Sequence, residues 1–208
     1  MLGSKSYMNK TFKNGIFDAK ESRSMYVGLS IIQDLKKENK LGNPVVIHLG
    51  TNGAGTDKVR RQIIDACGNR DIYWLTVTND NKVHINDKIK KLAEEYDNVH
   101  IIDWESYAKK NAVVDSSGKS SFFYKDGIHL KPSSNGVVGG REAYAKLIYD
   151  TIYKDYYDKA NEKKEQALKE HELEELKKYS FFGNSLLIGA FDELGAHYKG
   201  AFFSTSVN

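Results

Sequence analysis

Three short apolar segments, each preceded or followed by a helix-like segment, constrain the fold of this 208-residue chain more than any other feature. The apolar segments are PVVIHLG (44–50), DIYWLTVT (71–78) and NVHIIDW (98–104). Such largely apolar, β-branched runs are typical of strands that are buried on both faces of a parallel sheet. Amphipathic helices are predicted over residues 21–40, 56–68 and 83–96. This alternation predicts a three-layer α/β/α fold with right-handed crossovers.

The chain is long enough for one sizeable hydrophobic core and an appendage. Residues 1–153 hold the alternating segments and form the predicted α/β domain. Residues 154–178 are rich in charge and contain pairs such as Glu165 with Lys169, so a solvated linker helix about 30 Å long is expected. Residues 179–208 are expected to form a strand, a turn, a helix and a second strand.

The charge and cysteine content narrow the classes of protein to consider. A net charge of +3, from 31 basic and 28 acidic residues, is too balanced to indicate a nucleic-acid partner. The single cysteine, Cys67, excludes an internal disulfide and a cysteine-based metal cluster, and it is expected in the core. No stretch approaches the roughly 20 apolar residues of a membrane span. Residues 1–15 lack the apolar segment of a signal peptide. If the natural setting is the cell exterior, the targeting element is expected either to be missing from this sequence or to lie on another part of a longer gene product.

Two polar stretches stand where such a fold places its functional loops, which is at the carboxyl ends of parallel strands. The first, HLGTNG (48–53), comes at the end of a predicted strand; Gly50 allows close backbone approach and Asn52 offers a carboxamide donor. An Asn-Gly turn without further role explains this segment equally well. In the second, Asp126-Gly127-Ile128-His129, the carboxylate can hold one ring nitrogen of His129 and leave the other as a general base. Taken alone, such a pair is more often a surface contact.

A third stretch, Gly183-Asn184-Ser185, stands near the end of the chain, between a predicted strand and a predicted helix. A serine at a helix N-terminus gains from the helix dipole and from free backbone N–H groups, which can also bind an oxyanion. Taken alone, Ser185 is explained as a helix N-cap. The three stretches together favour a catalytic triad of Ser185, His129 and Asp126.

The three stretches resemble the motifs of the SGNH (GDSL-type) hydrolase superfamily. GNSL (183–186) is similar to its nucleophile motif, GTN (50–52) to its Gly-x-Asn motif, and DGIH (126–129) to its Asp-x-x-His motif. Over residues 15 to 150 the chain most resembles the C-terminal domains of peptidoglycan O-acetyltransferases. The resemblance implies a flavodoxin-like α/β/α domain.

The resemblance also implies a role for each site residue, without a metal or an organic cofactor. Ser185 would be the nucleophile, His129 the base and Asp126 the residue that orients it. The oxyanion would be bound by Asn52 together with the backbone of Gly50 and of Ser22.

The sequence departs from the family pattern at two residues and in the order of its motifs. Asn184 stands where the family usually has aspartate, which keeps the size and removes a charge. Ser22 stands where glycine is common, which a backbone donor tolerates. The nucleophile motif comes last in this chain, whereas the family places it before the segment that contains Ser22.

Three arrangements are compatible with this order. A circular permutation would bring residues 179–208 back to their own sheet through the linker helix. Alternatively, the chain joins a domain that lacks its first strand to the opening of a second copy. Strand exchange would instead place residues 179–208 in the sheet of another molecule and form a homodimer. Both 14–23 and 199–208 are candidates for the strand before the oxyanion loop, which argues against a simple permutation. Permutation is still preferred to the fragment, which would leave a central sheet edge open.

The expected function is that of a serine esterase or O-acetyltransferase acting on acetylated carbohydrate, such as a cell-wall glycan, through an acyl-enzyme intermediate. The motifs do not distinguish water from a sugar hydroxyl as the acceptor. The alternative is a non-catalytic domain that binds carbohydrate on the same scaffold. By resemblance, the setting would be outside the cytoplasm or at the cell surface.

Overall fold

The computed structural model describes residues 2–78, 84–176, 180–181 and 202–203 of the chain. Two compact units, Met1–Ile152 and Tyr153–Asn208, are distinguished and are described separately below. The predicted nucleophile Ser185 and the motif around it lie outside the described residues.

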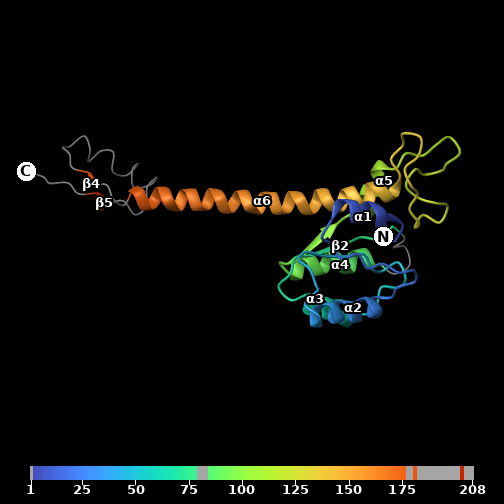
Figure 1. Cartoon of the computed structure of the whole chain (residues 1–208), viewed down its shortest axis with the longest axis horizontal. Coiled ribbons are helices and arrows are strands. Elements are labelled where there is room, and N and C mark those ends of the chain that lie inside the picture. The colour runs from blue at the N-terminus through green and yellow to red at the C-terminus, as the bar shows by residue number, and fades with distance from the viewer. Residues whose placement is uncertain (1, 79–83, 177–179, 182–201, 204–208) are drawn as a thin grey trace, which may run out of the picture. The chain divides into compact units, whose positions relative to one another are not determined.

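A three-stranded parallel sheet forms the centre of the first unit (Figure 1). Its strands lie in the order β1 (Val45–Ile47), β2 (Ile72–Leu75) and β3 (Val99–Ile102). In the register, Tyr73 of β2 lies opposite Val46 of β1 and His100 of β3. The three predicted strands are therefore present. Each is shorter than its apolar segment, because the residues at its carboxyl end turn away into a loop or, after β3, into a helix.

Three amphipathic helices cover one face of the sheet: α2 (Met25–Lys37), α3 (Asp57–Cys67) and α4 (Ile85–Glu95). Thr56, the first residue of the helix predicted over 56–68, is the N-cap of α3, because its side chain accepts a hydrogen bond from the Val59 N–H at 3.2 Å. The apolar sides of these helices pack with Ile72 and Trp74 of β2 in one buried cluster. Cys67 is fully buried there, which confirms its predicted place in the core.

The opposite face is covered by α1 (Lys5–Thr11), α5 (Trp104–Asn111) and the first part of α6 (Gly140–Leu176). The alternate residues of β2, Tyr73 and Leu75, pack here with Trp104 and Tyr144. The rings of Trp104 and Tyr144 meet edge to face, with their centroids 5.1 Å apart. Helices on both faces of a parallel sheet confirm the predicted three-layer α/β fold.

Several local predictions were wrong. The last predicted strand ends at Ile102, because Asp103 accepts a hydrogen bond from the Ser106 N–H at 3.2 Å and thereby caps the unpredicted helix α5. Helix α1, which follows a short 3-10 turn η1 (Leu2–Ser4), was also not predicted. Residues 14–23, one of the two candidates for a strand before the oxyanion loop, contain no strand.

The remaining elements belong to the end of the chain. Helix α6 begins in the first unit and runs without interruption through most of the predicted linker. In the second unit, β4 (Ser180–Phe181) pairs in parallel with β5 (Phe202–Phe203). The division of the chain into parts at 1–153, 154–178 and 179–208 stays a prediction. Among the residues that the structure describes, no helix is both long enough and apolar enough to cross a membrane.

Candidate active site

Asp126 and His129 are held together on a tight turn between α5 and α6. The Oδ2 atom of Asp126 lies 2.8 Å from Nδ1 of His129. Its Oδ1 atom accepts hydrogen bonds from the backbone N–H groups of Ile128 and His129, both at 2.8 Å. These bonds, led by the one from the His129 backbone, lower the pKa of Asp126 to about 2. The carboxylate is therefore ionised at neutral pH and fixes the orientation of the imidazole ring.

The His129 ring is held at one nitrogen and accessible at the other. Its side chain is 74% exposed, and Nε2 has no hydrogen-bond partner within the described part of the chain. The backbone N–H of Tyr124 donates to the His129 carbonyl oxygen at 2.9 Å, which keeps the turn closed behind the ring. Nε2 can therefore lie beside a nucleophile and act as the acceptor for its proton.

Gly50 and Asn52 lie in the loop that follows β1. Gly50 has a φ of +133°, and a Cβ atom at this position would lie 2.8 Å from Cγ1 of Ile85 in α4. Only glycine therefore fits this close approach of the loop to α4. The Gly53 N–H donates to the Gly50 carbonyl oxygen at 3.1 Å and closes a turn, with Asn52 exposed at its tip. The Asn-Gly turn is present, and it leaves the Asn52 carboxamide accessible.

Ser22 lies three residues before the start of α2. Its φ of +53° is in the left-handed region, where a residue with a Cβ atom costs about 1 kcal/mol. This conformation explains why glycine suits the position. Helix α2 approaches the loop after β1 so closely that a side chain at Gly28 would collide with Leu49. Helix α2, which follows Ser22, is thereby packed against the beginning of the loop that carries Asn52.

The sheet brings these loops to one edge. Because β1 and β2 are adjacent and parallel, the loops after them start at the same edge of the sheet. Thr78, in the loop after β2, donates from Oγ1 to the Gly127 carbonyl oxygen at 2.9 Å and so ties the Asp126–His129 turn to that edge. No sequence signal marks Thr78, which is a single threonine after a strand. Ser185, which would complete the predicted triad with His129 and Asp126, lies outside the described residues.

His48 also lies at this edge, where it packs against Tyr144 in the core. Its Nδ1 atom lies 2.8 Å from the hydroxyl oxygen of Tyr144, and the two rings stack with centroids 5.4 Å apart. Burial lowers the pKa of His48 to about 3 and raises that of Tyr144 well above its usual value. Both side chains are therefore neutral at physiological pH, and His48 joins the end of β1 to α6.

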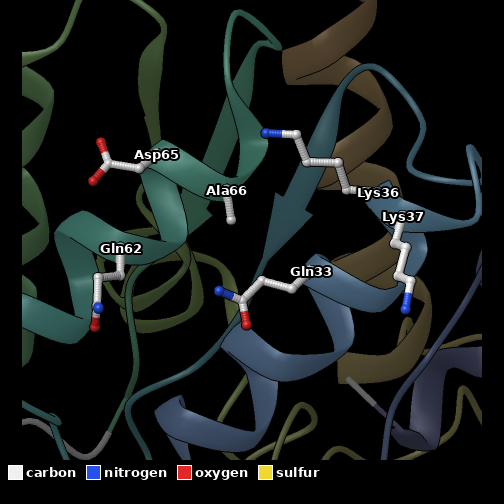
Figure 2. Close-up of a pocket in the computed structure, with 6 residues that line it drawn as sticks. All are labelled: Gln33, Lys36, Lys37, Gln62, Asp65 and Ala66. Carbon is white, nitrogen blue, oxygen red and sulfur yellow. The ribbon is translucent and has the colours of Figure 1, made fainter.

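A separate hollow of about 500 Å³ lies between α2 and α3 (Figure 2). It is lined by residues from the second half of each helix: Gln33, Lys36, Lys37, Gln62, Asp65 and Ala66. Since helices of this fold run opposite to the strands, these helix ends lie toward the amino ends of the strands, away from the edge described above. Because the hollow lies away from the edge that carries Asn52, we assign it no part in the candidate site.

The sequence comparison relates the chain to known enzymes. No family model matches the chain. The chain is 33% identical over 146 residues to the O-acetyltransferase OatA of Staphylococcus aureus. It is also 26% identical over 156 residues to the peptidoglycan O-acetyltransferase OatA of Listeria monocytogenes. The homologues of the chain are OatA-type peptidoglycan O-acetyltransferases. The aligned regions make up 69% and 74% of this chain and only 22% and 23% of those proteins, so the chain spans about a fifth of the relatives' length.

The fold comparison finds a domain of another OatA protein. The structure matches the C-terminal catalytic domain of peptidoglycan O-acetyltransferase A (OatA) of Streptococcus pneumoniae with a TM-score of 0.56 and 22% sequence identity. The match covers 74% of this chain and 85% of that domain. The chain therefore shares the fold of this catalytic domain.

Proposed function

We propose that the chain is a serine O-acetyltransferase or esterase that acts on acetylated cell-wall glycan, with peptidoglycan as the substrate class. The observation that carries this proposal is the Asp126–His129 pair, whose 2.8 Å contact and free Nε2 form the orienting and basic parts of a triad. The names of the homologues support the choice of acetyl transfer and of glycan.

In the proposed first step, the Ser185 hydroxyl attacks the carbonyl carbon of an acetyl ester while Nε2 of His129 accepts its proton. Asp126 stabilises the imidazolium ion that forms. The carboxamide of Asn52 and the backbone N–H groups of Gly50 and Ser22 would stabilise the oxyanion. The C–O bond to the first alcohol then breaks, this alcohol takes the proton from His129, and an acetyl-serine remains.

In the second step, a sugar hydroxyl or water attacks the acetyl-serine and gives its proton to His129. The serine oxygen leaves and recovers that proton, so the enzyme returns to its starting state. Transfer and hydrolysis therefore share all groups of the site and differ only in the acceptor.

The test measures release of the leaving alcohol from an acetyl ester, and acetyl transfer to a chitooligosaccharide, by the purified chain. The variants Ser185→Ala and His129→Ala are each expected to lose at least about 1,000-fold in kcat. The control His171→Gln changes an exposed histidine of α6 and is expected to keep full activity. Glycan binding without turnover by the wild-type chain would support the non-catalytic alternative instead.

The same variants test where Ser185 acts. We propose that Ser185 reaches His129 of its own chain, as in a circular permutation. A mixture of Ser185→Ala and His129→Ala chains then stays inactive. Recovery of about a quarter of the wild-type activity, the share expected for randomly mixed exchanged dimers, would instead establish strand exchange in a homodimer.

A further inference from the structure

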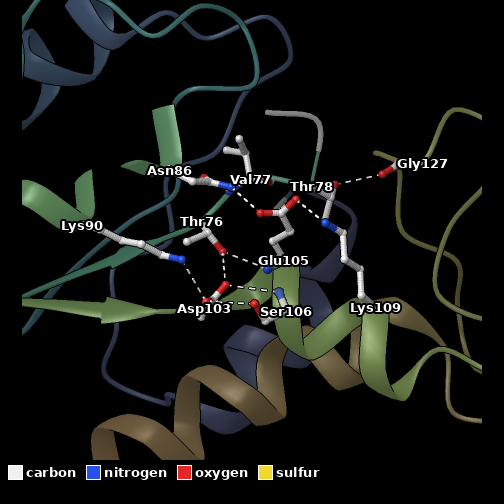
Figure 3. A network of polar contacts seen from close by, with 10 residues as sticks. All are labelled: Thr76, Val77, Thr78, Asn86, Lys90, Asp103, Glu105, Ser106, Lys109 and Gly127. Carbon is white, nitrogen blue, oxygen red and sulfur yellow. Dashed lines mark hydrogen bonds and ion pairs between the residues drawn. The ribbon is translucent and has the colours of Figure 1, made fainter. Parts of the chain in front are cut away.

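One hydroxyl group ties the Asp126–His129 turn to the sheet. Thr78 Oγ1 donates to the Gly127 carbonyl oxygen at 2.9 Å, across 49 residues of sequence (Figure 3). Gly127 has a φ of +68°, which glycine adopts without strain. The bond therefore joins the loop after β2 to the centre of the turn that carries the predicted base and its orienting carboxylate.

Through its position in the turn, this bond affects the orientation of the Asp126 carboxylate. The Gly127 carbonyl and the Ile128 N–H belong to the same planar peptide unit, so fixing the carbonyl also fixes the direction of the N–H. That N–H donates to Asp126 Oδ1 at 2.8 Å. Thr78 thereby acts, through one rigid peptide, on the carboxylate that holds His129.

The loop that carries Thr78 is itself held by a buried side chain. Asn86, on the first turn of α4, is only 3% exposed. Its amide accepts from the Val77 N–H and donates to the Val77 carbonyl oxygen, each at 2.8 Å. It also donates to Glu105 Oε2 of α5 at 2.8 Å, as Figure 3 shows. A side chain that satisfies both backbone groups of Val77 restricts the backbone next to Thr78.

A second contact holds the other side of the same loop. Thr76, which is fully buried, donates from its hydroxyl to Asp103 Oδ1 at 3.0 Å and accepts from the Glu105 N–H at 2.8 Å. The loop after β2 is therefore attached to both α4 and α5 before it reaches Thr78. The position of this loop is thereby restricted, and so is the position of the Thr78 hydroxyl that binds the Asp126–His129 turn.

We propose that Thr78 is a positioning residue: its hydroxyl, supported by Asn86, sets the Gly127 peptide so that Asp126 and His129 stay aligned. The structural part of this inference rests on the geometry alone. Its consequence for turnover rests on the function proposed above, so the two parts are tested by separate measurements.

The first measurement is amide hydrogen exchange of Ile128 and His129, whose N–H groups donate to Asp126. Thr78→Val keeps the side-chain shape and removes the hydroxyl, and exchange at both amides is expected to rise about fivefold to tenfold. Thr78→Ser keeps a hydroxyl and is expected to exchange like the wild type. The matched control is Thr151→Val, which removes a 2.8 Å bond from a threonine hydroxyl to the Leu147 carbonyl oxygen in α6. It should leave both amides unchanged.

The second measurement is steady-state turnover of an acetyl ester. Thr78→Val is expected to lower kcat about fivefold to tenfold with KM unchanged, and Thr78→Ser to restore it. Unchanged exchange at Ile128 and His129 in Thr78→Val overturns the proposal, and so does an equal rise across the amides of β2, which would show general destabilisation. A wild-type chain without turnover contradicts the proposed function, while the exchange result still decides the role of Thr78.

Discussion

The buried His48–Tyr144 pair makes the stability of the first unit depend on pH. The pKa of His48 is lowered from 6.5 to about 3 because burial disfavours the charged ring. The unfolded chain therefore binds a proton at His48 below about pH 6.5, whereas the folded chain does not. The stability that the neutral ring contributes is complete above about pH 6.5 and is lost as the pH falls toward about 3.

The magnitude follows from this difference in pKa. Each pH unit between the two pKa values costs about 1.4 kcal/mol of unfolding free energy. Between about pH 7.5 and pH 5, where most carboxylates are still ionised, His48 alone should lower the free energy of unfolding by about 2 kcal/mol. His48→Gln replaces the ring by an amide that does not titrate, and it is expected to remove this part of the pH dependence.

The assay is urea unfolding followed by tryptophan fluorescence. The two tryptophans of the chain, Trp74 and Trp104, are both buried in the first unit, so their signal reports its unfolding. The variant His171→Gln, which changes an exposed histidine, is the control and should keep the wild-type slope. Parallel curves for the wild type and His48→Gln between about pH 7.5 and pH 5 would refute the reasoning.

Three further predictions concern other buried or strained groups. Ser22→Gly should raise the free energy of unfolding by about 0.5 kcal/mol, because glycine relieves the left-handed φ of +53° at an entropic cost; urea unfolding measures this, and a loss of stability would contradict it. Asn86→Ala should lower that free energy by about 2–3 kcal/mol, because it leaves buried backbone groups of the loop after β2 without partners; an effect below about 0.5 kcal/mol would contradict this. Burial raises the pKa of Cys67 to about 11, so iodoacetamide at about pH 8 should label the thiol only in denaturant, and rapid labelling of the folded chain would oppose the prediction.

The fold was predictable to the extent that its signals are local. The three strands of the sheet follow from apolar runs. The start of α3 at Thr56 follows from the preference of hydroxyl side chains for helix N-caps. Helix α5 was missed because its cap, Asp103, directly follows an apolar strand, and the apolar Trp104 after it looks like a continuation of that strand. Residues 14–23 contain a short apolar segment, and periodicity alone does not distinguish such a segment in a strand from one in a loop.

The candidate site was predictable where its contacts are close in sequence. Asp126 and His129 are three residues apart, so their contact depends on one turn that the sequence itself encodes. Thr78 was missed because its bond to Gly127 spans 49 residues and depends on where two loops meet in space. The assignment of Ser185 as nucleophile stays a proposal that rests on its motif.

The sequence by itself determined the alternation of strands and helices, the Asp126–His129 turn and the resemblance to SGNH hydrolases, because each depends on residue types at short spacing. The tertiary structure decided what surrounds that turn. It placed the Gly127 carbonyl against Thr78, Asn86 against the loop that carries Thr78, and His48 against Tyr144. These contacts join residues that are distant in sequence, and their energies depend on burial, which only the packed fold specifies.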